Sequence, residues 1–155
     1  MKKFVRVMSA AMSAALVLTA MAGCGGSKDG SGSSDGKIKI GGIGPITGAA
    51  AIYGQAVKNA AEIAVEEINA KGEDIQFELQ FEDDENDAEK SVNAYNKLKD
   101  WGMQMLMGTV TSTPCQAVVE ETHKDNMFQL TPSGSAVESI KYDNAFRVCF
   151  SDPNQ

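Results

Sequence analysis

The chain has 155 residues and a formal net charge of −7, with 21 acidic residues against 14 basic ones. This acidic balance argues against nucleic-acid binding, which needs a basic face to neutralise phosphates. The chain has one histidine, His123, so a zinc site built on two histidines is not expected. We therefore expect neither a nucleic acid nor a metal ion among the partners.

The N-terminal segment has the three features of a secretory signal peptide. Its first six residues contain three basic side chains, residues 7–21 are apolar or weakly polar, and small residues lead up to Cys24. The apolar run is shorter than the ~20 residues that cross a membrane. We therefore predict a signal peptide over residues 1–23. An uncleaved anchor helix is the alternative.

The residues around Cys24 indicate how the protein is held in place. Met21-Ala22-Gly23-Cys24 resembles a bacterial lipoprotein box, in which the cysteine becomes the lipidated first residue, although leucine is preferred at the place of Met21. Residues 25–36 are mostly glycine and serine, the composition of a flexible tether. We expect an exported protein, lipid-anchored on the outer face of the bacterial cell membrane or the periplasmic side. A cleaved signal followed by a free Cys24 is the alternative.

Two cysteines remain in the segment after the linker, Cys115 and Cys149. Outside the cytoplasm they could form a disulfide. However, Cys115 is expected at the start of a helix and Cys149 in an apolar strand. Two buried thiols are the preferred interpretation, with a disulfide as the alternative.

Hydrophobic periodicity in residues 37–155 alternates between strand and helix. The expected strands are residues 37–43, 75–81, 103–107, 127–130 and 145–150. The expected helices are residues 53–71, 88–100 and 115–125, with a short helix starting near Ser135. Such an order with short connections predicts one α/β domain, a doubly wound, mainly parallel five-stranded sheet with helices on both faces.

The strand at 75–81 alternates apolar with polar residues, which suits an edge position better than a central one. Asp83 and Asp84 follow it, and we interpret them as a solvated strand end in preference to a metal or phosphoacceptor site. Asn86, with Glu89 three residues later, is predicted to cap the next helix.

The stretch 108–114 joins the third strand to the third helix and is rich in hydroxyl groups. Thr113 is predicted to be the N-cap of that helix, with Pro114 as its first residue and Gln116 as the partner in a capping box. The start of a helix has free N–H groups and a partial positive charge. We therefore expect the 108–114 turn to hold a small anion, with a carboxylate as the preferred interpretation.

In parallel sheets, ligands bind beyond the carboxyl ends of the strands, where the strand order switches. The segments expected there include residues 44–52, the 108–114 turn and the 131–135 turn, which are rich in Gly, Ser or Thr. No Ser-His-Asp or Cys-His arrangement with a supporting turn is visible. The glycines at 41–48 lack the Gly-Lys-Ser/Thr of a phosphate loop. We expect a binding protein without a cofactor, not an enzyme.

Several of these stretches, in their order and spacing, resemble branched-chain amino-acid-binding proteins of ABC transporters. They are residues 40–48, Tyr53-Gly54, residues 82–84, the 108–114 turn and residues 131–133. The resemblance implies one lobe of the two-lobed type I periplasmic binding fold, spanning residues 37–155. The family's chains are considerably longer. The resemblance therefore also implies a second lobe whose acidic and aromatic residues complete the site, and which is missing here.

The resemblance also implies roles for individual residues. Ser112 is expected to bind the ligand's α-carboxylate. In the 131–135 turn, the Ser133 carbonyl is expected to meet the α-ammonium and Ser135 to contribute its hydroxyl, with Gly134 between them. Tyr53 is expected near the ligand's side chain. Thr113 is either a ligand residue or only a helix cap, and Tyr53 alternatively begins the apolar stripe of its helix.

Two functions follow from this resemblance. The first is a lipid-anchored receptor that captures an amino acid, branched-chain or related, and delivers it to ABC permease subunits in the membrane. The second is a ligand-sensing domain of the same fold coupled to a signalling partner. The linker and the lipoprotein box favour the first function.

Overall fold

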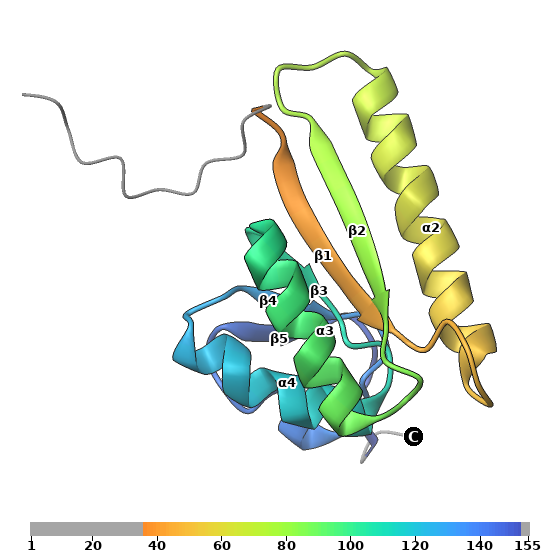
Figure 1. The fold of residues 1–155 in the computed structure, drawn as a ribbon, viewed down its shortest axis with the longest axis vertical. Helices are drawn as coiled ribbons and strands as arrows, with labels where there is room; N and C mark the ends of the chain where they lie inside the picture. The colour runs from red at the N-terminus through yellow and green to blue at the C-terminus, as the bar shows by residue number, and fades with distance from the viewer. Residues whose placement is uncertain (1–35, 153–155) are drawn as a thin grey trace, which may run out of the picture. The chain divides into compact units, whose positions relative to one another are not determined.

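A computed structural model describes residues 36–152 of the chain. Within that range five strands form one sheet in which every neighbouring pair is parallel (Figure 1). Their order is β2-β1-β3-β4-β5, so the predicted parallel α/β sheet is confirmed, with the second strand at an edge. The strands are β1 (Ile38–Gly44), β2 (Phe77–Asp83), β3 (Met105–Met107), β4 (Gln129–Thr131) and β5 (Ala145–Arg147).

Helices connect the strands in the predicted alternation. They are α2 (Ala51–Ala70), α3 (Ala88–Trp101), α4 (Ser112–Lys124) and the 3-10 helix η1 (Val137–Ile140). The last three strands are shorter than predicted. The predicted signal peptide, Cys24 and nearly all of the linker lie outside the described residues.

β1 lies between β2 and β3, and its glycines allow neighbouring side chains to come close. A Cβ atom on Gly41 would lie 2.5 Å from the sulfur of Met103, and one on Gly42 would lie 2.3 Å from the ring of Phe81. A larger residue at either position would therefore push the packing apart on one face of the sheet.

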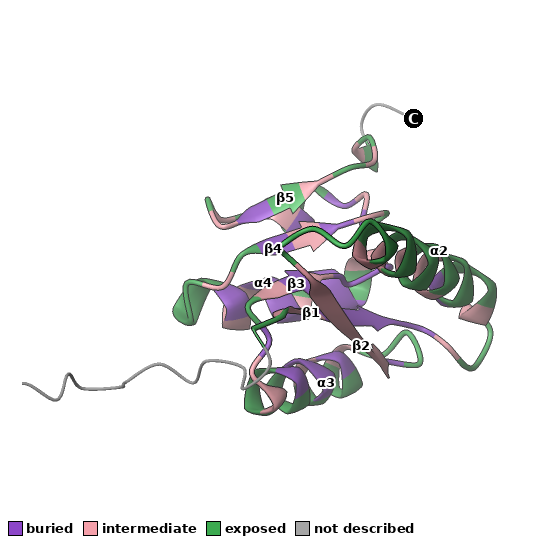
Figure 2. Ribbon diagram, turned by 90° about the horizontal axis from the view of Figure 1, so that it is seen from above, coloured by how far each residue is buried: buried purple, intermediate pink, exposed green. Residues whose placement is uncertain are grey.

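The hydrophobic core lies between the sheet and the helices α3 and α4. Its fully buried members include Ile43 on β1, Leu106 on β3, and Tyr95, Leu98 and Val118 on the two helices. Buried residues are concentrated on this side of the sheet, as the purple segments of Figure 2 show. Burial of apolar area here is the main source of stability, at ~25 cal/mol per Å².

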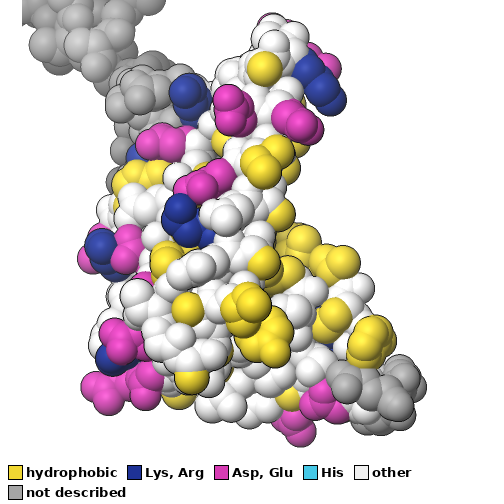
Figure 3. All heavy atoms as spheres, turned by 90° about the vertical axis from the view of Figure 1, so that its right-hand side faces the viewer, with side chains coloured by type: hydrophobic (Ala, Val, Ile, Leu, Met, Phe, Trp, Pro, Cys, Tyr) yellow, Lys and Arg dark blue, Asp and Glu magenta, His cyan; other side chains and the backbone are white. Residues whose placement is uncertain are grey.

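The other face of the sheet is covered less completely in the part of the chain that the structure describes. α2 packs against β1 and β2, but its only buried residue is Gly54. The alternative interpretation of Tyr53, as the start of the apolar stripe of its helix, is wrong, because its side chain is 64% exposed. Beyond α2, Phe128 and Phe146 stack at 5.4 Å and remain exposed. Hydrophobic side chains gather on this side of the molecule (Figure 3).

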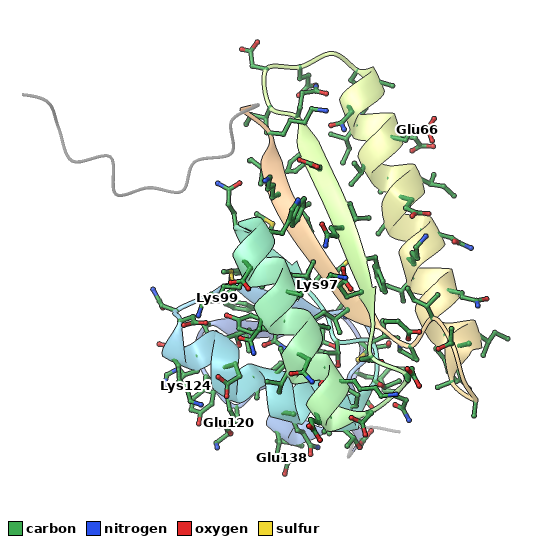
Figure 4. All side chains as sticks on the ribbon, in the orientation of Figure 1. Glu66, Lys97, Lys99, Glu120, Lys124 and Glu138 are labelled. Carbon is green, nitrogen blue, oxygen red and sulfur yellow. The ribbon has the colours of Figure 1, made fainter. Side chains whose placement is uncertain are left out.

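Charged side chains lie at the surface of the helices, including Lys97, Lys99 and Lys124 (Figure 4). Lys97 pairs with Glu82 at 2.7 Å and Lys99 with Asp125 at 2.5 Å. Exposed pairs of this kind contribute only ~0–1 kcal/mol each, so they do not determine the fold.

The cysteines are both free within residues 36–152. Cys115 is buried, as expected, and its burial raises the pKa of the thiol. Cys149 is only half-buried, which differs from the interpretation as a buried thiol.

The cap of α3 is one residue later than predicted. The Oδ1 atom of Asp87 accepts the N–H of Lys90 at 2.9 Å, and Asp87 has the extended backbone of an N-cap. Asn86 cannot take this place because its φ is +62°, in the left-handed region. The predicted Asn86–Glu89 capping box is therefore wrong.

The acidic pair before this cap is less solvated than predicted. Asp84 is completely buried; its Oδ1 accepts the N–H of Asn86 at 2.9 Å, and its Oδ2 has no hydrogen-bond partner in the described structure. Burial raises the pKa of Asp84 to about 6. Asp83 is half-buried; although burial raises its pKa, hydrogen bonds from Thr47, Glu85 and Ile46 lower it below the ordinary value.

Replacing the cap residue tests the assignment of Asp87. Asp87→Ala should lower the free energy of unfolding by ~1 kcal/mol, because one N–H of the first turn of α3 loses its acceptor. Urea unfolding measures the loss. Glu89→Ala is the matched control and should change stability by less than ~0.5 kcal/mol. A larger loss for Glu89→Ala than for Asp87→Ala would restore the capping box.

The raised pKa of Asp84 predicts how the stability of the fold changes with pH. Its pKa in the folded state, about 6, lies above the ordinary value of 3.8. The protonated carboxyl therefore favours folding below pH ~4, and this contribution is lost as pH rises through about 6. The free energy of unfolding of the wild-type protein should therefore fall by on the order of 2 kcal/mol between these pH values, and Asp84→Asn should abolish this fall.

Urea unfolding across pH 4–7 checks this, with Asp83→Asn as the comparison. The lowered pKa of Asp83 has the opposite effect on stability, because its stabilising contribution is present at neutral pH and is lost as pH falls through its folded pKa. If Asp84→Asn leaves the pH profile of stability unchanged, Asp84 is not the titrating group.

Candidate functional site

A pocket of about 290 Å³ lies beyond the carboxyl ends of the sheet. Its lining comes from the segments that follow β1, β3 and β4, next to the place where the strand order switches between β1 and β3. The lining residues are Tyr53, Val110, Thr111, Ser112, Ser133 and Ser135. Four of the six residues predicted to bind a ligand are thus brought together in one pocket, and their contact with a ligand stays a prediction.

The 108–114 turn is fixed to two neighbouring strands. Gly108 donates its N–H to the carbonyl of Leu130 at 2.9 Å, and Val110 donates its N–H to the carbonyl of Ile43 at 3.2 Å. The turn therefore continues the line of β3, and it delivers the chain directly into the first turn of α4.

Ser112 is the first residue of α4, and its hydroxyl is oriented by the neighbouring turn. The N–H of Ala136 donates to the Ser112 Oγ at 3.2 Å. Because that contact uses a lone pair of the oxygen, the hydroxyl proton is available for an acceptor in the pocket. The first N–H groups of α4 also lack partners within the helix. This arrangement suits a carboxylate.

The predicted cap at Thr113 is wrong. α4 begins at Ser112, and Thr111 is the N-cap, with φ −112° and ψ 155° and no side-chain cap bond. Thr113 is instead a helical residue; it is exposed and does not line the pocket. Pro114 is tolerated in the third helical position because the N–H groups of the first turn have no partner in the helix in any case.

The 131–135 turn is joined to the 108–114 turn by hydroxyl groups. Thr131 Oγ1 donates to the carbonyl of Thr109 at 2.7 Å, and Ser133 Oγ donates to the carbonyl of Val110 at 2.5 Å. Gly134 N donates back to Thr131 Oγ1 at 2.8 Å. Gly134 is buried and does not line the pocket; a Cβ atom there would lie 2.7 Å from Thr131 Oγ1. Its role is to let the turn close.

Two residues that the sequence did not single out support the two turns, Arg147 at the 131–135 turn and Gln129 at the 108–114 turn. The guanidinium of Arg147 on β5 donates to the carbonyls of Ser135 at 2.9 Å and Ala136 at 3.0 Å. Gln129 on β4 is fully buried, and its Nε2 donates to the carbonyl of Gly108 at 3.0 Å. The Thr122 hydroxyl donates to the other end of the Gln129 amide at 2.6 Å.

Two lining residues were also missed, Val110 and Thr111. Thr111 Oγ1 is buried and has no hydrogen-bond partner in the described structure. The signal for both was their position at the end of a strand directly before the predicted helix, because that is where parallel sheets place ligands.

Two other hollows lie on the α2 side of the sheet, and their lining is apolar. One is formed by α2 with Ile40, Leu79 and Met107, and the other lies between Met107 and Phe128. Neither offers polar groups that would orient a charged ligand. Over residues 36–152 there is also no cluster of three or more side chains that could hold a metal ion. No helix in the same range is long and apolar enough to cross a membrane.

Comparison with known proteins places these features in a family. The sequence profile of the family described as periplasmic binding protein matches residues 37–155. The Leu/Ile/Val-binding protein BraC3 of Rhizobium johnstonii is 35% identical over 122 residues, which cover 76% of this chain and 33% of the relative. The leucine-, isoleucine-, valine-, threonine-, and alanine-binding protein of Pseudomonas aeruginosa is 33% identical over the same shares of the two chains.

Solved structures agree with this. The branched-chain amino acid substrate-binding protein LivJ of Streptococcus pneumoniae, in complex with isoleucine, aligns with a TM-score of 0.70 and 28% identity. The alignment covers 75% of this chain and 34% of LivJ. The leucine-binding protein LivK of Thermotoga maritima aligns with a TM-score of 0.68 and 27% identity, covering 76% and 34%.

The chain therefore spans about a third of the length of the relatives that it matches. These relatives are solute-binding proteins, and the shared fold is the type I periplasmic binding fold. The matched family points to a location outside the cytoplasm. On the family profile, on relatives above 30% identity and on the fold, the chain belongs to the periplasmic binding protein family.

Proposed function

We propose that this chain is the N-terminal lobe of an extracytoplasmic receptor that binds an amino acid, branched-chain or related, and delivers it to an ABC transporter permease. The observation that carries the proposal is the pairing of an oriented Ser112 hydroxyl at the start of α4 with the 131–135 turn across one pocket. Relatives named for binding leucine, isoleucine and valine, and one holding isoleucine, support the choice of ligand.

The carboxylate of the amino acid binds at the 108–114 turn. Ser112 donates its hydroxyl proton, and the free N–H groups at the start of α4 point toward the same anion. Hydrogen bonds to a charged acceptor are stronger than those between neutral groups, so this end of the ligand supplies much of the binding energy.

The ammonium group binds at the 131–135 turn. Because the Ser133 hydroxyl already donates to Val110, the Ser133 carbonyl is the group that this residue offers to a cation. The hydroxyl of Ser135 lines the pocket beside it and accepts a second N–H. Tyr53 contacts the ligand's side chain from the rim.

The pocket is open, and a second lobe closes it. Closure buries most of a bound ligand's surface and excludes water, so the residues of that lobe complete the affinity and, together with Tyr53, choose the side chain. The relatives' greater length is consistent with such a lobe. We assign residues 37–155, the range that the family profile matches, to the first lobe.

The N-terminal segment tethers the receptor to the membrane. Residues 1–23 act as the signal peptide, Cys24 carries the lipid, and residues 25–36 are the flexible linker. A lipid tether leaves the receptor free to meet the permease, and it favours transport over a signalling role. The solute-binding relatives likewise favour a receptor over an enzyme.

Replacing Ser112 tests the proposal. In the full-length protein, Ser112→Ala should weaken amino-acid binding by roughly 1.5–3 kcal/mol, because the carboxylate loses a hydrogen bond. Isothermal titration calorimetry with leucine, isoleucine and valine measures the change.

Thr113→Ala is the matched control. This hydroxyl stands next to Ser112 in sequence but is exposed and does not line the pocket, so its loss should leave the affinity unchanged. Equal affinities for wild type and Ser112→Ala would remove Ser112 from the site. A wild-type protein that binds no amino acid would overturn the proposed function itself.

A further inference from the structure

Tyr53 forms one wall of the pocket, and it comes from a different part of the chain than the other lining residues. The other lining residues come from the 108–114 and 131–135 turns, whereas Tyr53 stands in the first turn of α2. Tyr53 is 64% exposed, and the only buried residue of α2 is the glycine beside it, Gly54. The packing of large side chains therefore does not fix the position of this end of the helix.

A single carboxylate, that of Asp83 at the end of β2, holds the connection that precedes α2. Its Oδ1 accepts the N–H of Ile46 at 2.8 Å and that of Thr47 at 3.4 Å, and its Oδ2 accepts the Thr47 hydroxyl at 2.5 Å. Oδ1 also accepts the N–H of Glu85, in its own turn, at 2.9 Å. Asp83 thus joins the turn after β2 to the connection between β1 and α2.

Two contacts join this connection to the start of α2, where Tyr53 lies. The Gln55 side chain in the first turn of α2 donates to the carbonyl of Ile46 at 2.8 Å. A Cβ atom on Gly54 would lie 1.9 Å from the carbonyl oxygen of Pro45, so the helix backbone rests directly on the connection. Since Gly54 and Gln55 follow Tyr53 in sequence, a shift of the connection moves Tyr53 as well.

We propose that Asp83 is a positioning residue that holds Tyr53 against the ligand's side chain and thereby sets the preference for large over small side chains. Asp83 does not line the pocket and acts only through the connection that it holds. This inference rests on the proposed function, because it needs an amino-acid ligand whose side chain reaches Tyr53.

The test compares two ligands that share a head group and differ in side-chain size, L-leucine and L-alanine. Asp83→Ala in the full-length protein should weaken leucine binding about tenfold more than alanine binding, since only leucine has the methylene and methyl groups that contact the wall. Asp83→Asn keeps one acceptor oxygen and should have a smaller effect in the same direction. Calorimetry gives both affinities, and thermal unfolding shows that each variant is folded.

A double-mutant cycle separates positioning from general loosening of the fold. If Asp83 acts through Tyr53, Asp83→Ala should have little further effect on leucine affinity in a Tyr53→Ala background. Asp87→Ala is the matched control, because it removes a nearby carboxylate that caps α3 and leaves the β1–α2 connection intact. It should lower the melting temperature and leave the ratio of leucine to alanine affinity unchanged.

The outcomes are distinct. Equal losses for leucine and alanine, or additive effects of the Asp83 and Tyr53 variants, would overturn the positioning role while leaving the proposed function intact. A wild-type protein that binds neither amino acid would overturn both. A selective, non-additive loss for leucine would support the inference.

Discussion

The hydrogen bonds between the 108–114 and 131–135 turns are the interaction on which the site depends. Thr131 and Ser133 donate hydroxyl protons to backbone carbonyls of the first turn, and the Ser112 oxygen accepts the N–H of Ala136, directly after the second turn. Each bond joins a side chain to backbone, so it fixes the path of the chain as well as the position of a group. Two adjacent strand ends therefore act as one rigid unit, which is what recognition of a small head group needs.

Gln129 extends this unit into the core. Its amide is fully buried and satisfied at both ends, by Thr122 on α4 and by the carbonyl of Gly108. A buried amide with a missing partner costs more than the bond itself contributes, so the three groups are held in one arrangement. The 108–114 turn, where we propose that the carboxylate binds, is thereby tied to α4, which begins at Ser112.

The sequence predicted the order of strands and helices because hydrophobic periodicity reports which face each element buries. It located the pocket because a parallel sheet places ligands at its carboxyl ends. It did not predict the N-caps correctly, because local backbone geometry decides between similar neighbouring residues. The N-cap of α4 is Thr111 instead of Thr113, and that of α3 is Asp87 instead of Asn86. The alternative interpretation of Tyr53, as the start of an apolar stripe, is wrong because the first turn of α2 leaves its large side chains exposed. No sequence pattern marks Gln129, since its partners Thr122 and Gly108 lie on another element and in a turn.

The site consequently has two parts that are anchored in different ways. The proposed head-group site consists of the 108–114 and 131–135 turns, which hydrogen bonds tie to β1, β4 and β5. The Tyr53 wall rests on a helix with one buried glycine and on the carboxylate of Asp83. Because α2 packs against β1 and β2, the proposal implies that substitutions near the wall change which side chain fits without disturbing the head-group site. Under the proposed function, this separation would let one lobe keep a common head-group site while its side-chain preference varies.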